Sequence, residues 1–318
     1  MKLFIVMYHY VRDLGRSRYP AIKGLETNKF ITQIQYLYKN FTIIRMEDLL
    51  NAINGGALPD RPALLTFDDG YIDNYVTVLP ILDNYGLQGS FFAPSLILES
   101  NKLLEVNKIH IILASGDHTS IYKMLIDEID YYRGTEFDIP ETKYLLDKYA
   151  ALNRFDTAEI IFIKQMLQRV LPEKLREIIT DKLFCNFVGV AESVLAKELY
   201  CNIGQLRVMK KMGMFIGVHG DSHKWLGDMD KIAYEKDLKH SIDTLGDAGL
   251  IDEKSWVISY PSGSWNKGVI EFVKMNNGVA GLTTEVRVAD LGKDDCLLLP
   301  RLDTNDFPPV SENYFNVQ

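Results

Sequence analysis

The stretch ALLTFDDGY, residues 63–71, decides how this 318-residue chain is interpreted. Its apolar start has the pattern of a buried strand, and that strand ends in two adjacent carboxylates, Asp68 and Asp69. A second apolar run, MFIGV at 214–218, ends in His219 and His223, which are separated by three residues. Histidines and carboxylates that follow buried strands are the ligand types of a catalytic metal site, here with one carboxylate to spare.

Each motif alone has a simpler explanation. Asp-Asp-Gly is a common turn, because Asp bonds its own backbone and Gly accepts a positive φ, and histidine pairs are often ordinary surface or core residues. Both motifs at strand ends in one chain favour the metal site. Adjacent side chains on an extended strand point in opposite directions, so we expect one aspartate to bind the metal and the other to accept a proton from water.

Composition is that of an ordinary globular protein, with 47% hydrophobic and 25% charged residues. The net charge of −8 gives no basic surface for phosphates, so we expect no nucleic-acid partner. Cys185, Cys201 and Cys296 are far apart in sequence, which predicts neither a disulfide framework nor a zinc knuckle. The apolar run at 3–7 is too short for a signal peptide and we find no membrane-spanning stretch, so we expect a cytoplasmic protein.

Short apolar runs alternate with helical patterns, at residues 3–7, 63–67, 89–93, 214–218, 256–259, 279–282 and 297–299. Continuous rather than alternating apolarity is typical of parallel strands covered on both faces, so we expect an α/β barrel. The carboxyl ends of such strands share one face, where barrel enzymes build active sites. The polar residues that follow the runs should therefore meet there: His9, Asp68, Asp69, His219, Tyr260, Thr283, Thr284 and Arg301.

Residues from about 104 to 200 show helical patterns without strands, so we expect a helical insertion. Asp156 and Glu159 predict a capping box for a helix that Pro172 ends. A further helix follows at once, and Asn202 with Gln205 predicts the cap of another, closed by Gly213. The insertion could be a lid, an oligomer interface or extra packing against the barrel, and the oligomeric state stays open.

The TFDDG motif, the His219/His223 pair and SYPSG at 259–263 together resemble the polysaccharide deacetylase family, of the NodB-homology or carbohydrate esterase 4 type. The resemblance implies one distorted (β/α) barrel over residues 1–318, a divalent metal, and hydrolysis of an N-acetyl group from an amino sugar. It implies Asp68 as general base and Asp69, His219 and His223 as metal ligands. It also implies that the Tyr260 backbone N–H helps to hold the oxyanion. Zinc is the metal we expect first, with cobalt, nickel and iron open.

Three positions depart from the family's pattern. The family usually has Ser or Thr where this chain has Gly220, so the histidine loop must be held in another way. The family's arginine that orients the base is missing from the third motif, and Arg301 or Arg12 could replace it, unless both are solvated surface residues. No histidine follows Leu297, so the usual general acid is absent. We expect His9 to replace it; the alternative is a structural strand end bonded to a backbone carbonyl.

Trp225 and Trp265 lie close after the second and third motifs and could stack on a sugar ring, although aromatic residues are more often simply buried. The expected substrate is an N-acetylated sugar or glycan intermediate, with nucleotide-linked, lipid-linked and free forms all open. Two rival hypotheses remain. A non-haem Fe(II) oxygenase would use two histidines and a carboxylate but predicts a jelly roll of alternating strands, which this sequence lacks. A degenerate barrel would bind glycan without turnover.

Overall fold

The computed structural model describes residues 1–151 and 156–317, and the chain divides into two compact units. The first unit, called here the sheet unit, comprises Met1–Asp13, Gly24–Lys102 and Ala196–Gln318. The second, called here the helical unit, comprises Leu14–Lys23 and Leu103–Leu195. The sheet unit holds all the predicted site residues.

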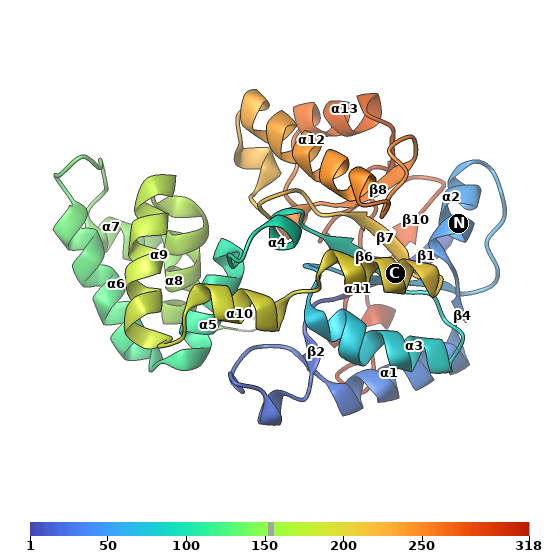
Figure 1. Cartoon of the computed structure of the whole chain (residues 1–318), viewed down its shortest axis with the longest axis horizontal. Helices are drawn as coiled ribbons and strands as arrows, with labels where there is room; N and C mark the ends of the chain where they lie inside the picture. The colour runs from blue at the N-terminus through green and yellow to red at the C-terminus, as the bar shows by residue number, and fades with distance from the viewer. Residues whose placement is uncertain (152–155, 318) are drawn as a thin grey trace. The chain divides into compact units, whose positions relative to one another are not determined.

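The sheet unit is built on one curled sheet in which the order along the main path is β10-β1-β5-β6-β7-β8-β9 (Figure 1). The pairs from β1 through β9 are parallel, β10 is antiparallel to β1, β11 pairs with β1, and β4 pairs with β5. The strands are β1 Lys2–Tyr8, β4 Thr42–Ile43, β5 Pro62–Phe67, β6 Ser90–Ala93, β7 Phe215–Val218, β8 Trp256–Ser259, β9 Gly278–Leu282, β10 Ala289–Asp290 and β11 Leu302–Asp303. A separate small sheet pairs β2 (Val11–Arg12) with β3 (Leu25–Glu26).

Six of the seven predicted strands are present, and the seventh is wrong. Residues 297–299 form a turn, because the Asp295 side chain accepts a hydrogen bond from the Leu297 N–H at 2.9 Å and its carbonyl accepts one from the Leu298 N–H. Only Leu299 makes an isolated bridge, to Leu282 at the end of β9. Three residues later β11 pairs with β1. This one segment therefore contacts both β9 and β1, and it carries Arg301 between the two contacts.

Helices accompany the sheet in the order expected of βα units: α1 Thr27–Asn40, α2 Met46–Ile53, α3 Leu79–Asn84, α4 Leu96–Glu99, α11 Ile203–Lys211, α12 Lys231–Asp247 and α13 Lys267–Met275. Figure 1 shows α12 and α13 side by side. The predicted capping box at α11 is confirmed, since the side chains of Asn202 and Gln205 each accept the other's backbone N–H. Gly213, at φ +89°, follows this helix and leads into β7.

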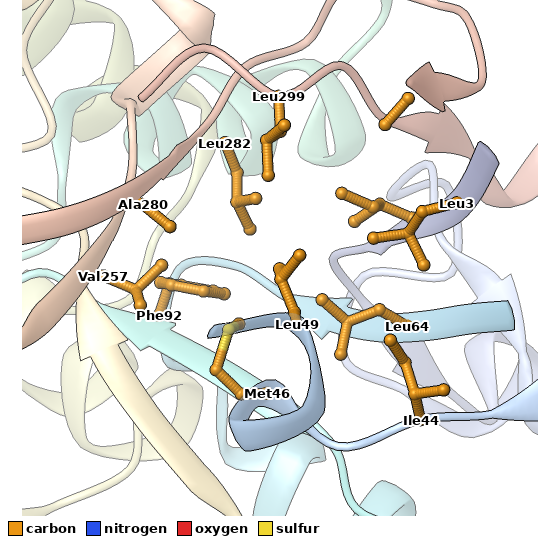
Figure 2. Close-up of a cluster of buried hydrophobic side chains, with 12 residues drawn as sticks. Leu3, Ile44, Met46, Leu49, Leu64, Phe92, Val257, Ala280, Leu282 and Leu299 are labelled. Atoms are coloured by element: carbon orange, nitrogen blue, oxygen red, sulfur yellow. The ribbon is translucent and has the colours of Figure 1, made fainter. Parts of the chain in front are cut away.

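A buried cluster of hydrophobic side chains joins the sheet to α2 (Figure 2). Leu3, Leu64, Val257 and Leu282 come from four different strands, and Leu49 of α2 packs among them. All five side chains are buried. Burial of apolar surface on this scale contributes about 25 cal/mol per Å² removed from water, so this cluster is a principal source of the unit's stability.

The helical unit consists of α5 Glu105–Ser115, α6 His118–Tyr132, α7 Thr142–Tyr149, α8 Ala158–Gln165, a π-helical turn at Met166–Val170 and α9 Glu173–Phe187, with α10 Glu192–Leu199 spanning its boundary with the sheet unit. The predicted cap of α8 is wrong by one residue, because Thr157 accepts from the Ile160 N–H. Asp156 instead forms ion pairs with Lys23 and Lys164. Pro172 separates the π-helical turn from α9 as predicted.

Two further findings bear on the sequence predictions. Cys185, Cys201 and Cys296 carry free thiols. Within residues 1–151 and 156–317, no helix has both the length and the apolar character needed to cross a bilayer.

Candidate metal centre

Three predicted ligands meet at the carboxyl ends of neighbouring strands. Asp69 follows β5, while His219 and His223 follow β7. His219 Nε2 and His223 Nε2 each lie 3.2 Å from Asp69 Oδ1, and all three ligand atoms lie within 4.8 Å of one another. Strands β5 and β7 both pair with β6, so the parallel sheet itself aligns the two motifs although about 150 residues separate them.

The spacing of these atoms fits a divalent cation. Asp69 Oδ1 and His219 Nε2 are buried and have no hydrogen-bond partner among the described residues. Two such lone pairs repel at 3.2 Å unless a positive charge lies between them. Tetrahedral zinc with ligands at about 2.0–2.1 Å places neighbouring ligand atoms about 3.3 Å apart. The donor set therefore matches a small tetrahedral metal in both chemistry and dimensions.

Neighbouring groups orient the ligands. His219 Nδ1 lies 2.6 Å from the Ser259 carbonyl oxygen, which can only accept, so Nδ1 carries the hydrogen and Nε2 presents its lone pair. The Tyr71 hydroxyl donates to Asp69 Oδ2 at 2.6 Å and leaves Oδ1 facing the histidines. Burial alone would raise the pKa of Asp69, but His223 and His219 lower it well below its ordinary value.

Asp68, the other carboxylate of the pair, has different surroundings. The buried Arg301 guanidinium donates to both carboxylate oxygens, at 3.0 Å and 2.7 Å, and the Ser259 hydroxyl donates to Oδ2 at 3.1 Å. Burial alone would raise the pKa of Asp68, but Arg301 and then His219 lower it below the ordinary carboxyl value. Asp68 is thus an ionised carboxylate beside the ligand set. Arg12, the alternative candidate, pairs with Asp73 at 2.8 Å instead.

His9 lies next to the two carboxylates. It follows Tyr8, whose carbonyl accepts the Asp68 N–H at 2.9 Å, so His9 leaves β1 alongside Asp68. A positive charge on His9 would help to lower the pKa of both Asp68 and Asp69, after the larger effects named above. The side chain is partly exposed, like that of His223, whereas Asp69 and His219 are buried.

The predicted oxyanion role of Tyr260 is contradicted by its backbone. The Tyr260 N–H already donates to the Leu282 carbonyl at 3.0 Å, as part of the pairing between β8 and β9. Its side chain is fully buried, and burial raises the pKa of the phenol above its ordinary value. The sequence motif could not reveal that strand pairing continues one residue beyond β8.

The two predicted sugar-stacking residues lie on two loops that are joined by hydrogen bonds. The Gly227 N–H donates to the Ser264 hydroxyl at 3.0 Å, and Asn266 donates to the Gly227 carbonyl at 3.0 Å. This contact links the loop that contains Trp225 with the loop that contains Trp265. Trp265 is 42% exposed, whereas Trp225 is partly buried, so Trp265 offers the more open aromatic face.

Three of the five non-glycine residues with positive φ in the described chain lie in or beside the motifs of the site. They are Asp69, His223 and Ser262, with φ of +71°, +56° and +54°. Such conformations cost of order 1–3 kcal/mol each and occur preferentially at functional sites. Sequence reasoning missed Ser259 and Tyr71 as partners of the site, although both stand inside or directly beside the motifs. The only sequence feature that could have indicated either residue was a hydrogen-bonding side chain near the carboxyl end of a strand.

Comparison with known proteins agrees with this geometry. The family model described as polysaccharide deacetylase matches residues 55–121 and 191–278, the segments that hold Asp68, Asp69 and both histidines. These two segments of the chain match the polysaccharide deacetylase family. The putative polysaccharide deacetylase YxkH of Bacillus subtilis (strain 168) is 31% identical over 93 residues, which are 29% of this chain and 31% of that protein. This match therefore spans only about a third of the relative's length.

Solved structures share the fold over the whole chain. The Streptococcus pyogenes deacetylase PplD in complex with acetate superposes with a TM-score of 0.60 at 18% identity, covering 100% of this chain and 98% of that one. IcaB from Ammonifex degensii gives 0.56 at 15% identity, with 97% and 95% covered. The predicted α/β fold of NodB-homology type is confirmed, as a curled half-barrel. It is not the jelly roll that the oxygenase hypothesis requires.

Proposed function

We propose that this protein is a metal-dependent hydrolase that removes an N-acetyl group from an amino sugar in a glycan or glycan precursor. One observation carries the proposal: an ionised carboxylate, Asp68, is held by a buried arginine directly beside three converging metal-ligand atoms. A barrel that only bound glycan would gain nothing from this buried ion pair, whose desolvation is costly. We take residues 1–318 as one such barrel, with the helical unit inserted in it.

Asp69, His219 and His223 would hold the metal, with zinc the first candidate and cobalt, nickel or iron the others. A bound divalent metal polarises a carbonyl and makes water more acidic. Asp68 accepts the proton of the attacking water, and Arg301 keeps it ionised and correctly oriented. The low pKa of Asp68 makes it a base that is already deprotonated at neutral pH.

Completion of the reaction needs an acid. As the water oxygen bonds to the acetamide carbon and the C–N bond breaks, the leaving nitrogen must receive a proton. His9 is the candidate, because it leaves β1 beside Asp68 and retains partial exposure to an incoming substrate. The products are acetate and a free amino sugar.

The substrate class follows from what surrounds the site. The net charge of −8 disfavours a polyanion, including nucleic acid, and favours a neutral sugar. Trp265, with Trp225 on the adjoining loop, would provide an aromatic wall for a sugar ring. A cytoplasmic location stays a prediction, which cell fractionation checks.

The direct test measures acetate release from a panel of N-acetylated sugar nucleotides and oligosaccharides, with metal analysis of the same preparation. We expect release from at least one neutral N-acetylated substrate and its loss after chelation. Tight glycan binding without release of acetate, in metal-loaded protein, would favour the non-catalytic barrel instead.

A further inference from the structure

The loop between the two histidine ligands has an unusual backbone. Gly220 adopts φ +68° and His223 adopts φ +56°, so the chain enters the left-handed region twice within five residues. Conformations of this kind persist only where surrounding groups hold them. Gly220 has no side chain with which to hold this turn, so the restraint must come from neighbouring groups.

Asp237 of α12 supplies three hydrogen bonds to this loop. Its carboxylate accepts the Asp221 N–H at 2.8 Å, the Ser222 N–H at 3.1 Å and the Ser222 hydroxyl at 2.6 Å. Asp237 is only 7% exposed, and no Lys or Arg among the described residues forms an ion pair with it, although its charge is felt by His240 of the same helix. A carboxylate buried in this way depends on hydrogen-bond donors, and all three donors come from the loop.

Ser241 adds a fourth restraint from the same helix. Its hydroxyl donates to the Gly220 carbonyl at 2.8 Å. Asp237 and Ser241 are four residues apart, so they lie on one helix face, and between them they hold all three residues that separate the histidines. A Cβ at Gly220 would lie 3.0 Å from Asp237 Oδ1, so the glycine permits both the positive φ and the close approach of the carboxylate.

We propose that Asp237, supported by Ser241, is a positioning residue for the metal centre. It fixes the loop so that His219 and His223 already face Asp69 before a metal binds. This inference rests on the metal site of the proposed function. Groups that orient metal ligands typically contribute about 10- to 100-fold in metal affinity, and we expect an effect of that size here.

The test measures the dissociation constant for Zn²⁺ by competition with a chromophoric chelator. Asp237→Asn keeps the shape of the side chain but turns one acceptor into a donor that faces a loop N–H. We expect its dissociation constant to rise about 10- to 100-fold. Asp243→Asn is the matched control, because Asp243 lies on the exposed side of the same helix and pairs only with Lys239 in the described structure. Its affinity should equal that of the wild type.

A purely structural role for Asp237 predicts a different result. It would lower the thermal midpoint equally with and without Zn²⁺ and leave the dissociation constant unchanged, which would overturn the inference. If Asp237→Asn does not fold, the Ser222→Ala/Ser241→Ala double variant removes two of the four hydrogen bonds that join the loop to α12, while those from Ser95 and Leu96 remain. Unchanged Zn²⁺ affinity there overturns the inference equally. His219→Ala tests the metal site separately from the role of Asp237. Wild-type affinity in that variant would refute the metal site itself, whereas lost affinity there with normal binding in Asp237→Asn refutes only the role of Asp237.

Discussion

The middle and the carboxyl end of the same strands bury opposite kinds of groups. In β5, Leu64 lies in the hydrophobic cluster, whereas Asp68, directly after the strand, is a buried carboxylate paired with Arg301. The same change from apolar to polar occurs from β7 to His219. The strand interiors supply stability and the strand ends supply charge and strain. Changes at the ends should therefore alter chemistry far more than folding, and changes in the middle the reverse.

Substitution of either aspartate should give the largest loss of activity, and the two variants should differ in whether they keep the metal. Asp69→Asn should lose both metal and activity, because Asp69 Oδ1 is one of three ligand atoms. Asp68→Asn should keep its metal and lose activity by about 10²- to 10⁴-fold or more, as expected for removal of a general base. Elemental analysis of both variants together with acetate release checks this. Metal lost from Asp68→Asn but retained in Asp69→Asn would exchange the two roles.

His9→Ala should fold and bind metal normally and lose about 10²- to 10⁴-fold in turnover, the usual contribution of general acid catalysis. His118→Ala, which changes an exposed histidine of the helical unit, serves as the control and should behave as wild type. Near-wild-type turnover in His9→Ala would leave His9 as a structural strand end.

Arg301→Met should cost about 3–5 kcal/mol of stability at neutral pH, because it leaves Asp68 buried without its partner. In the wild type the pKa of Asp68 is lowered, so its contribution is complete above about pH 4 and is lost as pH falls further. In Arg301→Met, burial raises the pKa of Asp68 without the opposing effect of the guanidinium. Asp68 is then protonated at mildly acidic pH, which removes the buried charge. The difference in unfolding free energy between the wild type and Arg301→Met should therefore narrow as pH falls. The acid limb of the pH–rate profile of Arg301→Met should lie at higher pH than that of the wild type.

Denaturant unfolding between pH 4 and 8 measures this gap. Arg287→Met is the control, since Arg287 forms ion pairs at the surface, where such pairs contribute about 0–1 kcal/mol. A gap that stayed constant across this pH range would contradict the assigned coupling between Arg301 and Asp68.

Leu64→Ala tests the middle of the strand. It should cost about 2–5 kcal/mol in unfolding free energy, as buried leucine truncations do, while activity per folded molecule changes little. Ile232→Ala, at a position 81% exposed, should change stability by less than about 0.5 kcal/mol. If Leu64→Ala lost its metal under conditions in which the protein is still folded, the stability of the strand interior and the chemistry of the strand end would not be independent.

The sequence predicted those features that depend on local pattern. Buried strands and the two motifs at their ends are short-range signals, and parallel pairing then brings their ends together. Arg301 is different. Its partner Asp68 is 233 residues away, and the choice between Arg301 and Arg12 depends on the segment that contacts both β9 and β1. No local signal in the sequence encodes that contact.

The errors have the same origin. The Tyr260 N–H is engaged by β9, and the segment at 297–299 turns because of Asp295, so tertiary pairing and one side chain overrode the motif and the apolar run. The grouping of Leu14–Lys23 with the helical unit was equally invisible, since the ion pair between Lys23 and Asp156 joins positions 133 residues apart.

Anomalous diffraction at the zinc edge from crystals of the Zn²⁺-loaded protein tests the central claim most directly. We predict one strong peak about 2.0–2.2 Å from Asp69 Oδ1, His219 Nε2 and His223 Nε2, with Asp68 outside the coordination sphere and still bound to Arg301. A peak at the other cluster of possible ligands, Glu99, Asp221 and His240, with none at Asp69, would contradict the account.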